Sequence, residues 1–364
     1  MAKVQISRVQ LVFALVWCVI GTGIVAIPTA IAQFTVRDAW ICALLFSVGG
    51  TLVALLTSLF TRYFPNRTLT NALMDAWGPW LGRLIGIWFM AGLYITNCTV
   101  VREAEVFVGT TILPKTPEVM IGAFAMVAVA YAVYMGVEVV MRDVEFITPL
   151  VMLIAPILFV LSMQHIDIHE MMPVLADGWT PVLRGGVVSI LVYALEMVIV
   201  LQFIPFLRRG KLAAKDVSIA TLIITLVLTI VTAVTIGVVG PATHYLSYPV
   251  LEAVRNVRVG RFLERLDTLY VIAVISTIFV KMTVSHYAWC TGMKDLFHLS
   301  SHRVTTLSGA LLVWGGANVL FENANDVQQF IFYTGPTYAV CTLLLTPLLA
   351  VAGIVVKKAM AVKR

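Results

Sequence analysis

Charged residues are scarce in this chain. They make up 12% of its 364 residues, whereas hydrophobic residues make up 60%, and the mean hydropathy is +0.96. A soluble protein needs more polar surface than this composition supplies, so a sizeable soluble domain is excluded. Apolar runs of about 18 or more residues recur along nearly the whole sequence, each long enough to cross the hydrocarbon core of a bilayer as a helix. The sequence therefore predicts an all-α polytopic membrane protein, with residues 1–364 forming a single transmembrane domain.

The sequence lacks the residue patterns of several kinds of chemistry. The five cysteines lie inside apolar runs rather than in loops, so no disulfide framework is expected. The patterns H-E-x-x-H, G-x-S-x-G and G-x-x-x-x-G-K-[ST] do not occur, and no basic tract suggests nucleic-acid binding. The polar stretch His165–Glu170 is interpreted as a loop rather than a zinc site. We expect neither an enzyme nor a bound cofactor or metal.

The apolar runs divide into about ten predicted spans. Two inverted repeats of five spans each, over residues 9–163 and 181–356, would account for this number. Lysine and arginine are about twice as frequent on the side of the N-terminus as on the other side, so both termini are predicted to be cytoplasmic. The outer segment 247–267 is predicted to be an amphipathic helix, with a solvated loop as the alternative. The predicted spans are 9–32, 38–61, 83–112, 119–137, 144–163, 181–207, 212–239, 266–293, 304–320 and 330–356.

The first span contains Gly21-Thr22-Gly23 and, further on, Pro28, residues that weaken a helix. In hydrocarbon an unwound turn survives only where it lines a cavity or meets a ligand. Unwinding here would expose N–H groups suited to a carboxylate and carbonyl groups suited to a cation, and an amino acid carries both charges. The alternative is close helix packing at the glycines with a simple proline kink.

Two further anomalies lie in the second repeat. Helix 6, which would correspond to helix 1, begins with Gly185-Gly186 and carries Glu196 about halfway across. Helix 8 carries Lys281 deep in its apolar run, where an ammonium group could take the place of a coupling sodium ion. A structural ion pair between Glu196 and Lys281 is the alternative.

Helix 3 carries three charged residues near its outer half, Arg102, Glu103 and Glu105. Arg102 and Glu105 are three positions apart and share a helix face, so an ion pair within the helix is the first interpretation. A gate facing an extracellular vestibule is the second.

The stretches "ILPKTP", "YALEMVIVLQFIPFL", "YPVLEAVRNVRVGRFLERLD" and "FVK" together resemble the endospore germination permease family, the B subunits of spore germinant receptors in the amino acid-polyamine-organocation superfamily. The resemblance implies a LeuT-like inverted-repeat fold with discontinuous helices 1 and 6. It also implies a small germinant, commonly an amino acid, and two partners, a membrane A subunit and a lipoprotein C subunit.

The resemblance also suggests site residues. The superfamily's substrate site falls on Gly21, Thr22 and Gly23 in helix 1 and on Tyr193, Ala194 and Glu196 in helix 6, while Lys281 matches a cation-ligand region of sodium-coupled relatives. Many family members have glycine at the position of Ala194. This departure leaves open how far helix 6 unwinds.

The combined expectation is an integral protein of the bacterial cell or spore inner membrane that binds an amino-acid-like germinant near the bilayer midplane and signals to its partners. The alternative is a proton-coupled amino-acid transporter in which Glu196 or Lys281 titrates in each cycle. A purely structural scaffold subunit is a third possibility.

Overall fold

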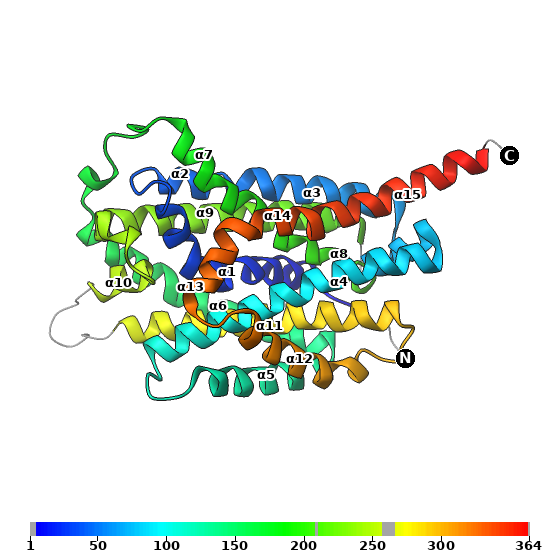
Figure 1. Ribbon diagram of the computed structural model, residues 1–364. Coiled ribbons are helices and arrows are strands. Elements are labelled where there is room, and N and C mark those ends of the chain that lie inside the picture. The colour runs from blue at the N-terminus through cyan, green and yellow to red at the C-terminus, as the bar shows by residue number, and fades with distance from the viewer. Residues whose placement is uncertain (1–4, 208–209, 257–265, 363–364) are drawn as a thin grey trace.

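A computed structural model describes residues 5–207, 210–256 and 266–362, and these residues form a helical bundle (Figure 1). A single isolated bridge between Ile6 and Leu207 is the one element of β structure among them. The helices are α1 (Arg8–Ala32), α2 (Ala39–Leu44), α3 (Phe46–Tyr63), α4 (Leu69–Thr111), α5 (Glu118–Met135), α6 (Val137–Ser162), α7 (Trp179–Val187), α8 (Val200–Phe203), α9 (Ala213–Val239), α10 (Pro249–Arg255), α11 (Asp267–Leu296), α12 (Arg303–Leu320), α13 (Ala324–Gln329), α14 (Gly335–Ala339) and α15 (Leu345–Val362).

The helices have the length and composition of membrane spans. In the described residues, nine helical segments are long and apolar enough to cross a bilayer. The tenth predicted span, 304–320, is also a helix, α12. The third predicted span begins too late, because α4 extends from Leu69 across a kink at Gly78, whose φ of 83° is left-handed. The prediction of an all-α polytopic membrane protein is confirmed.

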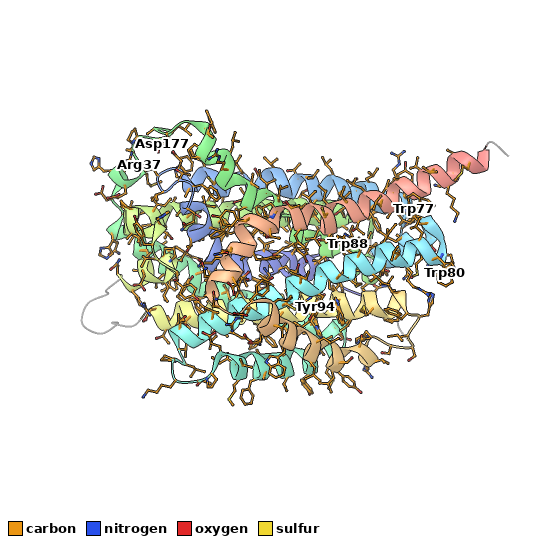
Figure 2. The ribbon with its side chains drawn as sticks, in the orientation of Figure 1. Arg37, Trp77, Trp80, Trp88, Tyr94 and Asp177 are labelled. Carbon is orange, nitrogen blue, oxygen red and sulfur yellow. The ribbon has the colours of Figure 1, made fainter. Side chains whose placement is uncertain are left out.

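The two ends of the bundle differ in their side chains. Trp77 and Trp80 lie near the end at which α1 begins and α15 ends, whereas Arg37 and Asp177 lie at the opposite end (Figure 2). The Trp80 side chain is exposed, as is typical of an aromatic anchor at a membrane interface. We call these the terminal end and the far end of the bundle.

Helix α1 lies at the centre and packs against α11, α9 and α6. Ser7 caps its N-terminus by accepting from the N–H of Gln10, while the Gln10 side chain accepts from the N–H of Ser7. Its apolar sequence is buried on nearly every side, as expected of a helix with no polar stripe.

The prediction of a broken helix 1 is wrong. Helix α1 runs from Arg8 to Ala32 without interruption, and Pro28 lies inside it. The glycines serve close packing instead, which was the alternative. A Cβ atom at Gly21 would lie 2.9 Å from the carbonyl oxygen of Thr277 and 3.1 Å from the Cβ of Lys281. Helices α1 and α11 can therefore approach so closely only because this position lacks a side chain.

The segment Trp179–Phe206, the predicted helix 6, does depart from α-helical geometry. After α7 the chain forms a π-helix over Val188–Tyr193 and a 3₁₀-helix over Leu195–Ile199. Such departures shift the hydrogen-bond register and are frequent at functional sites. The last span, Ala324–Met360, also contains two π-helical stretches, Phe330–Thr334 and Val340–Leu344, which were not predicted from the sequence.

The predicted amphipathic segment 247–267 is only partly described. Helix α10 covers Pro249–Arg255, and Val250, Leu251 and Val254 bury their side chains against the bundle. Residues 257–265 lie outside the described residues. The described part therefore has the buried apolar face that the sequence pattern predicts.

The residues just before α1 are hydrogen-bonded to the end of helix 6. The N–H of Ile6 donates to the carbonyl oxygen of Phe206 at 2.8 Å. Arg8 also donates to the buried carboxylate of Asp216 in α9, at 2.6 Å. These contacts join α1, helix 6 and α9 at the terminal end of the bundle.

Candidate functional site

A buried ion pair lies where α1, the irregular helix 6 and α11 meet. The ammonium group of Lys281 contacts the two carboxylate oxygens of Glu196 at 3.0 and 2.9 Å and donates to the hydroxyl of Thr22 at 2.9 Å. Lys281 is 2% exposed, and 13% of the Glu196 side chain is exposed. The alternative of a Glu196–Lys281 ion pair is therefore confirmed, and Thr22 completes the surroundings of the ammonium group.

Small cavities surround this pair. The first, of about 10 Å³, is lined by Lys281, Glu196, Cys18 and Ser285 among others. The second, of about 30 Å³, shares Glu196 with the first, and its wall also includes Tyr193. Because Glu196 lines both cavities, it lies between them.

A third cavity, of about 60 Å³, continues toward the far end of the bundle. Thr29, Phe107 and Tyr248 lie in its wall. It shares Glu103 and Ile331 with the second cavity. The three cavities therefore form a series that extends from the ion pair toward the far end.

Tyr193 presents a free polar group at the centre of this series. Its hydroxyl is buried and has no hydrogen-bond partner among the described residues. The centre of its ring lies 5.9 Å from the ammonium group of Lys281, within the range of a cation–π contact. A buried hydroxyl without a partner is costly, so a ligand that bonds to it would gain free energy.

The remaining predicted site residues have packing roles in this structure. Gly21 contacts α11, and a Cβ atom at Gly23 would lie 3.6 Å from the Tyr193 ring. The Cβ of Ala194 would approach within 2.7 Å of a side chain added at Gly49 in α3. The methyl group of Ala194 therefore contacts α3, and these three residues shape the backbone around the ion pair.

Glu103 also lines the cavities, although no role was predicted for it from the sequence. It lies in the walls of the second and third cavities. At 100° per residue it is rotated away from the helix face that Arg102 and Glu105 share. A carboxylate within a span is by itself a reason to suspect function, and this signal was available in the sequence.

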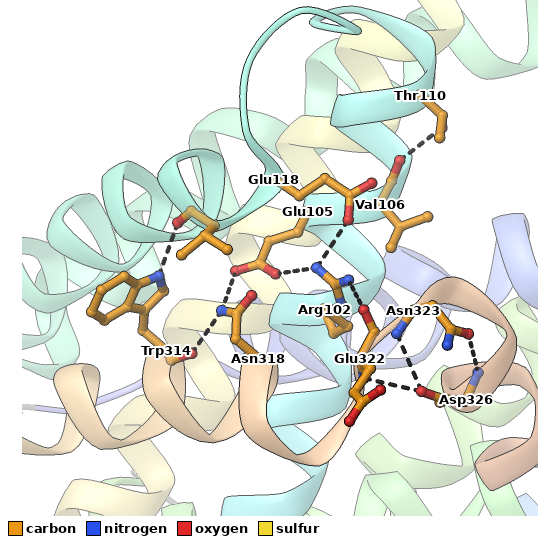
Figure 3. A network of polar contacts seen from close by, with 11 residues as sticks. Arg102, Glu105, Val106, Thr110, Glu118, Trp314, Asn318, Glu322, Asn323 and Asp326 are labelled. Atoms are coloured by element: carbon orange, nitrogen blue, oxygen red, sulfur yellow. Dashed lines mark hydrogen bonds and ion pairs between the residues drawn. The ribbon is translucent and has the colours of Figure 1, made fainter.

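Arg102 belongs to a separate polar network (Figure 3). Its guanidinium group lies 2.9 Å from Glu105 and 3.0 Å from Glu118 and donates to the backbone carbonyl of Glu322 at 2.9 Å. Asn318 also donates to Glu105. The predicted ion pair of Arg102 and Glu105 is confirmed, and it extends to α5, α12 and the turn before α13.

No group of three or more histidine, cysteine, aspartate or glutamate residues suited to a metal ion occurs in the part of the chain that the structure describes. This covers the predicted loop at His165–Glu170, where Asp167 instead accepts from the N–H of His169.

Solved structures define the fold. MhsT in complex with L-phenylalanine superposes with a TM-score of 0.67 at 11% identity, covering 98% of this chain and 99% of that one. Mhp1, a nucleobase-cation-symport-1 family transporter, gives a TM-score of 0.72 at 11% identity, over 96% of this chain and 78% of that one. The chain therefore has the LeuT-like transporter fold.

The sequence comparisons define the family. Residues 5–327 match the family described as "Spore germination protein". Spore germination protein KB of Bacillus subtilis (strain 168) is 29% identical over 82% of this chain and 80% of its own length. Spore germination protein YndE of the same organism is 24% identical over 97% and 96%. The chain belongs to the spore germination permease family. It is a homologue of germinant receptor B subunits, and the members of this family are not enzymes.

Proposed function

We propose that this protein is the membrane subunit of a germinant receptor and binds a small amino-acid-like germinant at the site around Glu196 and Lys281. The observation that carries the proposal is the buried Glu196–Lys281–Thr22 cluster at an irregular helix, next to a series of cavities. Ionisable groups inside a membrane domain are expensive and usually functional. The unpartnered hydroxyl of Tyr193 provides a further contact for a ligand.

The roles of the residues follow from this geometry. Lys281 occupies a place between a carboxylate and a hydroxyl, where a cation would be held, which supports its role as a substitute for a coupling ion. Glu196 offers negative charge to the amine of the ligand. The N–H groups near Gly21 are engaged in a continuous helix, so the carboxylate of the ligand would contact the hydroxyls of Thr22 and Tyr193.

Signalling follows from the differential affinity of the ligand for two conformations, since a ligand shifts an equilibrium only by that difference. Partner A and C subunits would read the shift, and both termini would face the cytoplasm of a cell or spore. The fold supports this, because inverted-repeat transporters alternate access by rocking around a central site. The Ile6–Phe206 and Arg8–Asp216 contacts would open in such a movement.

Thermal stabilisation in detergent tests the proposal. The purified protein would be heated with a panel of amino acids, nucleosides and sugars, because a ligand that binds the folded state raises the melting temperature as its concentration rises. We expect a shift with one ligand class, lost in Glu196→Gln and in Thr22→Val. Glu138→Gln, at an exposed carboxylate paired with Arg142, is the matched control and should keep the shift. No shift with any compound at millimolar concentration would contradict the proposal.

A proton-coupled amino-acid transporter is the second candidate, favoured by the same buried pair of ionisable residues. Uptake into proteoliposomes that responds to a pH gradient, and that is lost in Lys281→Met, would support transport. Specific binding without flux would support a sensor.

A further inference from the structure

The carboxylate of Glu103 lies in the binding region without a basic partner. Among the described residues, the ion pairs of this part of the bundle join Lys281 to Glu196 and Arg102 to Glu105 and Glu118, and none involves Glu103. Its sequence neighbour Arg102 is directed into the network of α5 and α12 instead (Figure 3). A charged carboxylate in a buried cavity is unfavourable unless another group compensates it.

The charges around the cavities do not balance. Two carboxylates, Glu103 and Glu196, stand against one ammonium group, Lys281, so the formal sum is −2 + 1 = −1. Lys281 is the one basic side chain in the walls of the three cavities as the described residues form them. A zwitterion would add no net charge and leave this excess in place.

Glu103 lies where a ligand would meet it. It borders both the cavity that contains Glu196 and Tyr193 and the cavity that leads toward the far end. Tyr193, whose buried hydroxyl has no partner among the described residues, lines the same cavity as Glu196. With volumes of about 30 and 60 Å³, the cavities admit only a small ligand in this conformation.

From this juxtaposition we infer that the site selects a small ligand with one net positive charge, whose ammonium group that is not balanced by a carboxylate of the ligand pairs with Glu103. The inference rests on the proposed function and specifies its ligand class as small cationic amines, including basic amino acids. Glu196 remains paired with Lys281, and Glu103 compensates the additional charge of the ligand. Charge complementarity of this kind chiefly determines specificity.

Binding of matched compounds to the full-length protein in detergent, by calorimetry or thermal shift, tests the inference. L-ornithine carries one net positive charge, and L-glutamine, with a side chain of similar length, is neutral overall. 1-Butylamine and 1-butanol form the corresponding pair without an amino-acid backbone. We expect ornithine to bind at least about tenfold more tightly than glutamine, equivalent to about 1.4 kcal/mol. Preference for butylamine over butanol without binding of ornithine would point to simple amines within the same class.

Variants of Glu103 locate the selectivity. Glu103→Gln should weaken ornithine binding by about 30-fold or more, since truncating one partner of a buried charged pair costs several kcal/mol. The affinity for glutamine should change much less, and Glu103→Asp should keep the preference for ornithine. Glu322→Gln is the matched control, because it removes an exposed carboxylate in the turn between α12 and α13, outside the walls of the three cavities, and should leave the ratio unchanged.

The outcomes separate this inference from the function on which it rests. If glutamine binds as tightly as ornithine, or if Glu103→Gln leaves the ratio unchanged, the inference is wrong. In that case the proposed site still stands, provided that Glu196→Gln and Thr22→Val abolish binding. If no compound binds, or if binding survives both of these variants, the proposed function fails as well.

Discussion

The ion pair between Glu196 and Lys281 gives the sharpest stability prediction. The perturbations are Lys281→Met, Glu196→Gln and the two together. The atoms lie 2.9–3.0 Å apart and little of either side chain is exposed. At an effective dielectric constant of about 20, the Coulomb attraction at this distance is roughly 6 kcal/mol. Most of it is offset by the cost of removing both charges from water.

Removing one partner should therefore be far more costly than removing both. Each single variant leaves a buried group without its partner and should lower the free energy of unfolding by about 3–5 kcal/mol. The double variant should lose much less than the sum of the two, with a coupling free energy of about 2 kcal/mol or more. Of the two single variants, Lys281→Met should have the larger effect, because it also removes the hydrogen bond from Lys281 to Thr22.

Equilibrium unfolding in mixed detergent micelles, followed by tryptophan fluorescence, measures these differences. Thr22→Val is the control for the third member of the cluster, since it removes a neutral hydroxyl and should cost about 1 kcal/mol. Additive single effects, with a coupling below about 0.5 kcal/mol, would refute the reasoning, because independent sites add within that range.

Three further predictions follow from other parts of the structure. Gly21→Ala should destabilise the protein by about 1–3 kcal/mol because its methyl group would overlap α11, whereas Gly315→Ala, with open space around it, should be neutral or slightly stabilising in the same unfolding assay. Arg102→Met should cost about 3–5 kcal/mol because it leaves the buried carboxylate of Glu105 without its basic partner, and Arg142→Met, in an exposed pair, should cost less than about 1 kcal/mol; equal losses would contradict this assignment. Burial lowers the pKa of His302, which lies between α11 and α12, so the folded state disfavours its charged form. Stability should therefore be fully present above the ordinary histidine pKa of about 6.5 and fall as the pH decreases below it, and a His302→Gln variant with an unchanged pH profile would disprove this contribution.

The sequence alone was sufficient for the fold class and the family. Span length and hydropathy depend only on local composition, because each helix must satisfy its own backbone hydrogen bonds in hydrocarbon. For the same reason the isolated charges were recognisable as functional candidates. Glu196, Lys281 and the Arg102–Glu105 pair stood out against apolar surroundings, and the structure places both pairs in contact.

The state of helix 1 was decided by tertiary packing. Gly21-Thr22-Gly23 is compatible with an unwound turn and with a close helix crossing, and only the position of α11 distinguishes them. The fit of Lys281 against Gly21 shows that the crossing applies in this structure. The intrinsic preferences of glycine do not distinguish an unwound turn from a close helix crossing, because both require a residue without a side chain.

The directions in which neighbouring carboxylates point were likewise decided by the packing of the helices. Glu103 and Glu105 are two positions apart on α4, yet Glu103 borders the central cavities and Glu105 binds Arg102 and Asn318. The helical periodicity of α4 predicts that the two residues lie on different faces, but it does not predict which face is directed toward the centre of the bundle. That choice depends on how α4 packs against the helices around it, since burial of an ionisable side chain is tolerated only where a partner or a cavity meets it. The sequence thus determined which residues carry charge into the membrane, and the tertiary structure decided which of those charges pair with each other and which one borders the central cavities.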